Sequence, residues 1–267
     1  LKDLRRDRQR RPERKIIAVV PGGSAMDLRE VCELCDAVLV CWYPGELGGT
    51  AVARTVVGKN NPSGRLPVTF YRNPGKMPDF EDYTLPGRTY LYTDQNVLYP
   101  FGYGLSYTTF AYKGIKADTR NLPKTAAAVE IDPDFSIRRD EAGQSQSDAG
   151  EKRPKQTAAP VAPSAPMLTV SIDVENTGAV AGDEVVQLYV RSPEDSGDRR
   201  IHHLEGFRRV SLKPGEKKRV SFALTAGQLA QFGKDGRQTL AKGVYRIFVG
   251  GGQPGYCDNT KCIMVEL

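Results

Sequence analysis

The chain has 267 residues, of which 39% are hydrophobic and 27 are glycine, a composition typical of a globular protein. The length suggests one large domain or two ordinary ones, and no apolar run approaches the roughly 18 residues of a membrane-spanning helix. The net charge is +6, but residues 1–15 contribute +5 of it. We interpret that segment as a solvated basic helix face, so we expect neither a nucleic-acid nor a membrane partner.

Two apolar strands, each followed by a helix, are predicted near the N-terminus. Residues 16–20 (IIAVV) are typical of a strand buried on both faces, and residues 37–42 (AVLVCW) form a second such run. We expect one helix around 26–35 and another from an N-cap at Thr50 to a stop at Gly58. This order indicates a parallel sheet, with too few strands for a complete doubly wound domain.

Two segments of unusual composition follow. Residues 59–108 are dense in proline, glycine and aromatic side chains. We interpret them as an ordered segment that packs through its rings, called the aromatic strap below. Residues 118–166 are rich in proline and alanine without sustained periodicity. Because such a segment buries too little surface to offset its ordering entropy, we predict a disordered insertion.

The rest of the chain is predicted to be a β-sandwich. Turn signals such as KPG and GGG separate alternating runs at 168–174, 184–190, 205–210, 218–224 and 244–249. About 100 residues are enough to bury a core of their own.

A few side chains could contribute chemistry. Trp42 ends a predicted parallel strand and Glu46 follows it, at the edge where ligands bind, so both could approach a sugar. Core packing of Trp42 and local pairing of Glu46 are the favoured interpretation. The acidic residues within 79–82 are expected to be solvated or paired with Arg88.

Three residue pairs have spacings that also occur in redox or metal sites: Cys32 and Cys35, Cys257 and Cys262, and His202 and His203. The first pair lies in an apolar-periodic stretch, where small buried cysteines are common. A disulfide within the second pair stays open, and adjacent histidines point apart on a strand. We therefore expect no metal site and no redox CxxC.

Several long motifs resemble glycoside hydrolase family 3. Its β-glucosidases and β-xylosidases have a C-terminal half similar to CDAVLVCWYPGELGGTAVARTVVGKNNPSGRLPVTFYRN, MPDFEDYTLPGRTYLY and LYPFGYGLSYTTFAY. The fibronectin type III-like domain that ends many of these enzymes resembles VENTGAVAGDEVVQLYV, HHLEGFRRVSLKPGE and KGVYRIFVGG. The resemblance covers 16–116 and 168–267 in the family's order, whereas residues 1–15 match poorly.

The resemblance implies an α/β remnant, the last strands and helices of an α/β sandwich domain, followed by an all-β fibronectin type III-like sandwich. The expected divisions are a basic segment at 1–15, the α/β part with the strap at 16–108, and the sandwich at 109–267, interrupted by the insertion at 118–166. The first strand of the sandwich would lie near 109–117, and the next would begin near Leu168.

The family resemblance also implies a chemistry. Retaining glycosidases use an aspartate nucleophile and a glutamate acid/base about 5–5.5 Å apart. In the family the nucleophile lies in an N-terminal barrel, and the acid/base precedes the strand that residues 16–20 match. We therefore assign no catalytic, cofactor-binding or metal-binding residue and expect no cofactor. The complete enzyme would release terminal β-linked glucose or xylose, and the missing barrel would be the partner of this chain.

Two alternatives stay open. Beside the β-glycosidase fragment, the chain could be a stand-alone non-catalytic module that binds carbohydrate or a partner through its β-sandwich, or a scaffold without sugar contact. The motifs do not separate glucoside from xyloside specificity, and they do not set the compartment or the oligomeric state.

Overall fold

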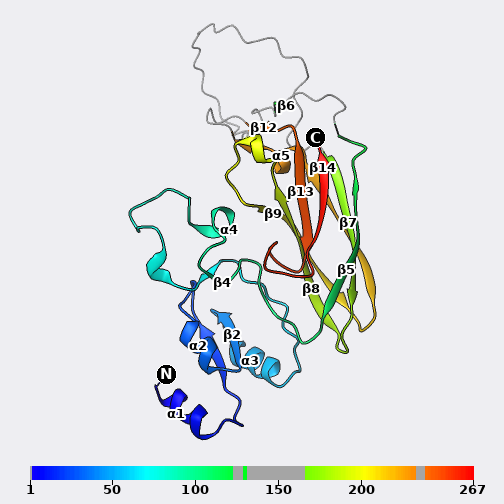
Figure 1. Cartoon of the computed structure of the whole chain (residues 1–267). Coiled ribbons are helices and arrows are strands. Elements are labelled where there is room, and N and C mark those ends of the chain that lie inside the picture. Colours follow the sequence, from blue (N-terminus) through cyan, green and yellow to red (C-terminus); the bar gives the residue numbers. More distant parts are fainter. Residues whose placement is uncertain (1, 123–128, 131–165, 233–237) are drawn as a thin grey trace, which may run out of the picture.

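The computed structural model describes residues 2–122, 129–130, 166–232 and 238–267. Figure 1 shows a small α/β part at the N-terminus, a tall β-sandwich at the C-terminus, and the aromatic strap between them. The predicted disordered insertion lies mostly outside the described residues. No described helix is both long and apolar enough to cross a membrane.

The α/β part contains α1 (Lys2–Arg10), β1 (Ile17–Pro21), α2 (Arg29–Leu34), β2 (Ala37–Trp42) and α3 (Gly48–Val56). β1 and β2 pair in parallel, which confirms the predicted β-α-β order. The predicted burial of the first strand on both faces is wrong, because Ile17 is 41% and Val19 is 43% exposed. Their side chains share one face of the strand, and no element of the described chain covers it.

Helix α3 begins three residues earlier than predicted. Leu47 is its N-cap, so the predicted N-cap at Thr50 is wrong and that residue lies in the first turn. Gly48 approaches Pro44 so closely that a Cβ would come within 2.5 Å of the proline ring. This tight approach starts the helix directly after the turn. The predicted stop is confirmed at Gly58, which has a φ of +74°.

The aromatic strap contains β3 (Phe70–Tyr71), η1 (Pro74–Lys76), α4 (Thr89–Tyr92) and β4 (Val97–Tyr99). β3 and β4 form a short antiparallel pair. Ring pairs hold the segment as predicted. Tyr90 stacks on Phe101 with centroids 4.1 Å apart, and Tyr99 stacks on Tyr103 at 5.0 Å.

Two antiparallel sheets form the sandwich. Their strands are β5 (Phe110–Asp118), β7 (Pro166–Asn176), β8 (Gly182–Arg191), β9 (His203–Leu212), β10 (Lys217–Thr225), β13 (Val244–Gly250) and β14 (Lys261–Glu266). One sheet has the order β10-β7-β5 and the other β14-β13-β8-β9. Every strand predicted in this region is present. β14 was missed, because a short apolar run between charged ends is a weak signal.

Short elements accompany the sandwich: β6 (Val129–Glu130), η3 (Glu194–Ser196), α5 (Ala226–Leu229), β11 (Gln231–Phe232) and β12 (Gln238–Leu240). Helix α5 begins with a capping box, in which Thr225 and Gln228 each satisfy the other's backbone N–H. This cap ends β10 and fixes where the chain leaves the sheet.

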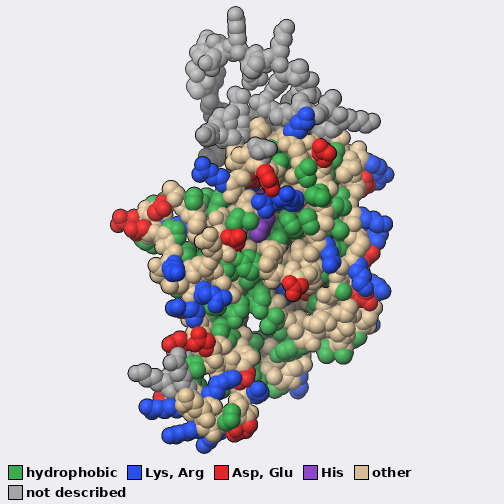
Figure 2. Space-filling view, viewed as in Figure 1, with side chains coloured by type: hydrophobic (Ala, Val, Ile, Leu, Met, Phe, Trp, Pro, Cys, Tyr) green, Lys and Arg blue, Asp and Glu red, His purple; other side chains and the backbone are tan. Residues whose placement is uncertain are grey.

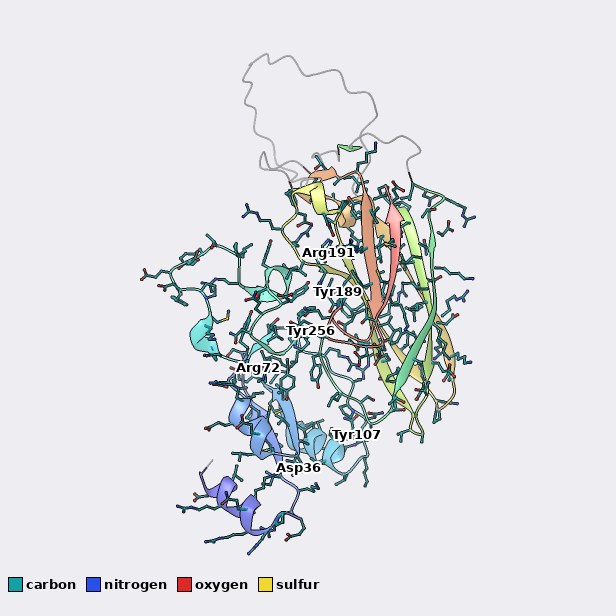
Figure 3. All side chains as sticks on the ribbon, in the orientation of Figure 1. Asp36, Arg72, Tyr107, Tyr189, Arg191 and Tyr256 are labelled. Carbon is teal, nitrogen blue, oxygen red and sulfur yellow. The ribbon has the colours of Figure 1, made fainter. Side chains whose placement is uncertain are left out.

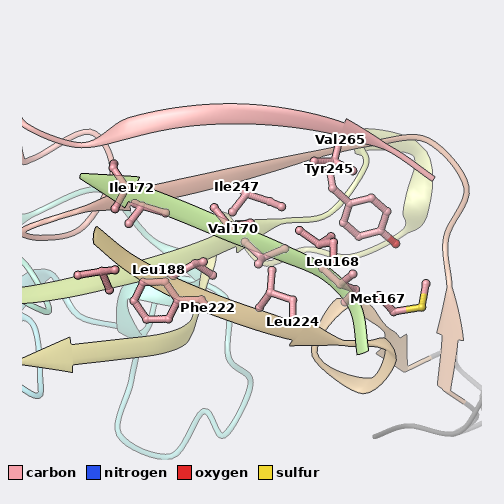
Figure 4. Close-up of a cluster of buried hydrophobic side chains, with 14 of the residues drawn as sticks. Met167, Leu168, Val170, Ile172, Leu188, Phe222, Leu224, Tyr245, Ile247 and Val265 are labelled. Carbon is pink, nitrogen blue, oxygen red and sulfur yellow. The ribbon is translucent and has the colours of Figure 1, made fainter. Parts of the chain in front are cut away.

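The hydrophobic core lies between the two sheets. Val170 and Ile172 of β7 face Leu188 of β8 and Ile247 of β13, and all four side chains are fully buried. Figure 4 shows these side chains interdigitating between the strands. Alternate residues of each strand reach this core, as a period of two requires.

Candidate functional site

The aromatic strap packs against the outer face of β8. Gln187 donates from Nε2 to the carbonyl oxygens of Gly102 and Gly251, both at 3.0 Å, and Tyr189 donates to Gln187 Oε1 at 2.6 Å. Gly102 has a φ of +75°, and a Cβ there would lie 2.2 Å from Gln187 Oε1. The glycine at this position is therefore required by both the backbone and the contact.

An aromatic cluster extends this junction. The ring of His202 lies 5.5 Å from that of Tyr189 and 6.1 Å from that of Tyr90. Tyr90 belongs to the strap, and its hydroxyl accepts from the backbone N–H of Leu204 at 3.1 Å. Burial lowers the pKa of His202 to about 4, since an imidazolium loses hydration there. Figure 3 shows Tyr189 and Arg191 on the side of β8 that faces the strap.

A buried ion pair fastens the strap to the end of the sandwich. Arg65 Nη2 lies 2.7 Å from Glu184 Oε2, and Tyr112 donates to Glu184 Oε1 at 2.7 Å. Burial raises the pKa of Glu184, and the charge of Arg65 opposes this rise. The Glu184 side chain is 2% exposed and both of its oxygens are occupied. This carboxyl is therefore structural and inaccessible to a substrate.

A hollow of about 610 Å³ lies beside β2 and is called the junction hollow below. β2, α3 and the strap supply most of its walls, and Arg209 of β9 also lines it. Figure 2 shows hydrophobic side chains along the middle of the molecule, between the lower and upper parts. The walls are mainly apolar, and Asp36 is their one carboxyl.

Asp36 is held in its charged form. Its carboxylate accepts from the N–H of Ile16 at 3.0 Å and from Lys15 Nζ at 3.1 Å, and Arg8 Nη1 lies 3.0 Å away. These donors lower the pKa of Asp36 to about 2. A general acid needs a raised pKa, so Asp36 does not suit that role.

A second hollow, of about 460 Å³, is polar and lies between the end of α3 and the sandwich. Its carboxyls are Asp183 and Glu216. The Ser211 hydrogen bond lowers the pKa of Asp183, and the backbone N–H of Lys213 lowers that of Glu216. Neither hollow thus places a carboxyl of raised pKa beside an ionised one, the arrangement that acid/base catalysis requires.

The two residues singled out at the end of β2 and after it have different surroundings. Trp42 lines the junction hollow, and its ring meets Phe70 edge-on with centroids 6.2 Å apart. Trp42 thus makes a ring contact but is half-buried beside a hollow and lies outside the core cluster, so its packing role stays a prediction. Glu46 is exposed, and within the described residues no hydrogen bond or ion pair involves it, so its predicted local pairing is wrong.

The acidic residues of the strap are organised by Arg88. Its Nη2 donates to the backbone carbonyl oxygens of Asp79 and Asp82, the latter at 2.7 Å, and not to their carboxylates. Thr84 donates its backbone N–H to Asp82 Oδ1 at 2.8 Å. Arg88 is thus the predicted partner of this cluster, but it binds the backbone of the loop and leaves the carboxylates facing outward.

The cysteine side chains are free thiols. Cys32 Sγ lies 3.1 Å from the hydroxyl of Tyr99. Cys257 Sγ lies 3.0 Å from Asn259 Oδ1, so the disulfide left open with Cys262 is not formed.

The two histidines are both buried, but they have different surroundings. His203 Nδ1 lies 2.5 Å from Glu205 Oε1, whereas His202 packs among rings. No cluster of three or more His, Cys, Asp or Glu side chains in the described ranges is placed to hold a metal ion.

The α/β part with the strap and the sandwich each match a known protein family. Residues 9–107 match the model of the glycosyl hydrolase family 3 C-terminal domain, and residues 184–253 match that of the fibronectin type III-like domain. The chain is 36% identical over 238 residues to a xylan 1,4-β-xylosidase of Xylanibacter ruminicola, covering 89% of this chain and 22% of that one. It is 34% identical over 259 residues to β-glucosidase A of Butyrivibrio fibrisolvens, covering 88% and 28%.

A solved structure agrees with this placement. The family 3 β-glucosidase of Bifidobacterium adolescentis superposes with a TM-score of 0.72 at 25% identity, covering 100% of this chain and 35% of that one. The fold is thus a small α/β part joined to a fibronectin type III-like sandwich. The chain matches the C-terminal part of members of glycoside hydrolase family 3. It spans about a quarter of the length of these curated relatives.

Proposed function

We propose that this chain supplies the accessory domains of a retaining β-glycosidase whose complete form releases terminal β-linked glucose or xylose. The nucleophile and the acid/base then come from polypeptide that precedes these domains in the family's order, and the chain alone is inactive. The observation that carries this proposal is the family match together with two hollows that lack a catalytic carboxyl pair.

The α/β part offers a place for that preceding polypeptide. Ile17 and Val19 leave one face of β1 apolar and exposed, and the free edge of the two-stranded sheet presents unpaired backbone groups. Further strands and helices of an α/β sandwich would pair with this edge and cover this face.

The domain limits follow the same division. We propose a basic segment at 1–15, an α/β part with its strap at 16–108, and a sandwich from 109 to the C-terminus. The beginning of β5 at Phe110 and the change from short elements to long antiparallel strands support the last limit.

The test is an activity comparison. The purified chain is assayed with 4-nitrophenyl β-glucoside and β-xyloside, alone and as a longer protein that includes the polypeptide encoded directly before Leu1. We expect hydrolysis by the longer protein, with the β-anomer appearing first in proton NMR spectra, and none by the chain alone. Glu46→Gln is the matched control and should leave the longer protein active.

Two results would contradict the proposal. One is hydrolysis by the chain alone that survives two unrelated chromatographic steps and disappears with Glu46→Gln. The other is a longer protein that folds but cleaves neither substrate.

A further inference from the structure

Residues 78–88 of the aromatic strap present two large rings to solvent. Phe80 and Tyr83 are each 88% exposed, and Leu85 of the same loop is 50% exposed. Figure 1 shows this part of the strap, between η1 and α4, projecting away from the rest of the molecule. In Figure 2 acidic and hydrophobic side chains gather at that end. Large exposed rings a few residues apart on one projecting loop are a candidate binding surface.

The loop is fixed in one shape by its own hydrogen bonds. Arg88 holds the carbonyl oxygens of Asp79 and Asp82 together. The carboxylates of these two residues accept from the backbone N–H groups of Glu81 and Thr84, at 3.3 and 2.8 Å. A ligand therefore meets an ordered surface and does not have to bear the entropic cost of ordering it.

The chemistry of the surface fits a neutral, hydroxyl-rich ligand. An aromatic face attracts the slightly positive C–H groups on the flat side of a pyranose ring, and carboxylate oxygens accept from sugar hydroxyls. Arg72, Lys76 and Arg88 balance the three acidic residues within 72–88. Because these charges cancel, the loop has little long-range attraction for a cationic partner.

We propose that Phe80 and Tyr83 form a carbohydrate-binding platform that holds a β-linked glucan or xylan chain. The pyranose rings stack on the two aromatic faces, and the carboxylates of Asp79, Glu81 and Asp82 accept their hydroxyls. No residue of this platform lines the junction hollow, so the platform is separate from that hollow. The choice of β-linked sugars rests on the proposed function.

The experiment is affinity electrophoresis of the full chain in native gels that contain soluble xylan, mixed-linkage β-glucan or dextran. We expect xylan or β-glucan to retard the chain and dextran not to. Phe80→Ala and Tyr83→Ala should each weaken the apparent affinity roughly threefold to tenfold, as the loss of one aromatic contact predicts. Phe232→Ala is the matched control, because this side chain is 72% exposed outside the platform. Thermal melts of the variants should match that of the parent, since both rings face solvent.

Several results would overturn the proposed platform or a part of it. The absence of retardation by all three polysaccharides would overturn the platform, as would equal retardation of the parent and the Phe80→Ala, Tyr83→Ala double variant. Retardation by dextran equal to that by xylan would overturn the assignment to β-linked sugars. Binding of a tetra-arginine peptide in place of polysaccharide would overturn it in favour of a cationic partner. Inactivity of the longer protein with platform binding retained would count against the proposed function alone.

Discussion

Acid should loosen the contact between the aromatic strap and the sandwich through His202. This side chain is 5% exposed and packs between Tyr90 of the strap and Tyr189 of β8. Burial lowers its pKa from 6.5 to about 4, the charges of Arg191 and His203 add to the lowering, and Asp94 opposes it. The folded chain therefore keeps this imidazole neutral at a pH where the unfolded chain protonates it.

The size of the effect follows from this difference in pKa. Below pH 6.5 the unfolded state binds one proton more than the folded state, so the free energy of unfolding falls as the pH falls. The loss is roughly 2 kcal/mol between pH 6.5 and 4.5, and it approaches about 3 kcal/mol once the folded state also becomes protonated near pH 4. Above pH 6.5 the contribution is fully present.

The assay is urea unfolding of the chain and of a His202→Gln variant, followed by far-UV circular dichroism at pH 6.5, 5.5 and 4.5. The variant loses packing at every pH, so the informative quantity is the difference in slope against pH and not the stability at one pH. We expect the parent to lose roughly 2 kcal/mol more than the variant over this interval. Parallel pH profiles for the two proteins would refute the reasoning about His202.

Two other predictions concern stability. Arg65→Met leaves the Glu184 carboxylate buried without its ion-pair partner, and should lower the free energy of unfolding by about 3–5 kcal/mol near neutral pH. The loss should shrink as the pH falls and Glu184 takes up a proton, because burial raises the pKa of this carboxyl, and a urea series at decreasing pH that shows no such relief would disprove this. Amide hydrogen exchange should be slowest in residues 168–267, which hold the core, and faster in 16–60, where the sheet has two strands. Exchange measured by mass spectrometry in the reverse order would count against the assignment of the core.

The order of elements was accessible from the sequence because local patterns carry it. Alternation with a period of two marks β7, β8, β10 and β13, and continuous apolar runs mark β1 and β2. In the sandwich, the alternating patterns report what each residue prefers to contact, so they also locate the core there. Strand β14 was not predicted, because its pattern is weak and its place depends on pairing with β13 and not on its own composition.

The tertiary structure alone decided which surfaces are covered. The apolar run at 16–20 is compatible with burial on both faces, but the number of neighbouring strands sets its exposure, and here β2 is its one partner in the described sheet. The sequence likewise places Arg88 near an acidic cluster, while the fold decides that it binds carbonyl oxygens and turns the carboxylates outward. The sequence predicted that the strap packs through its rings, and it did not indicate that Phe80 and Tyr83 are exposed. Exposure depends on contacts between residues far apart in the chain, and local patterns do not encode such contacts.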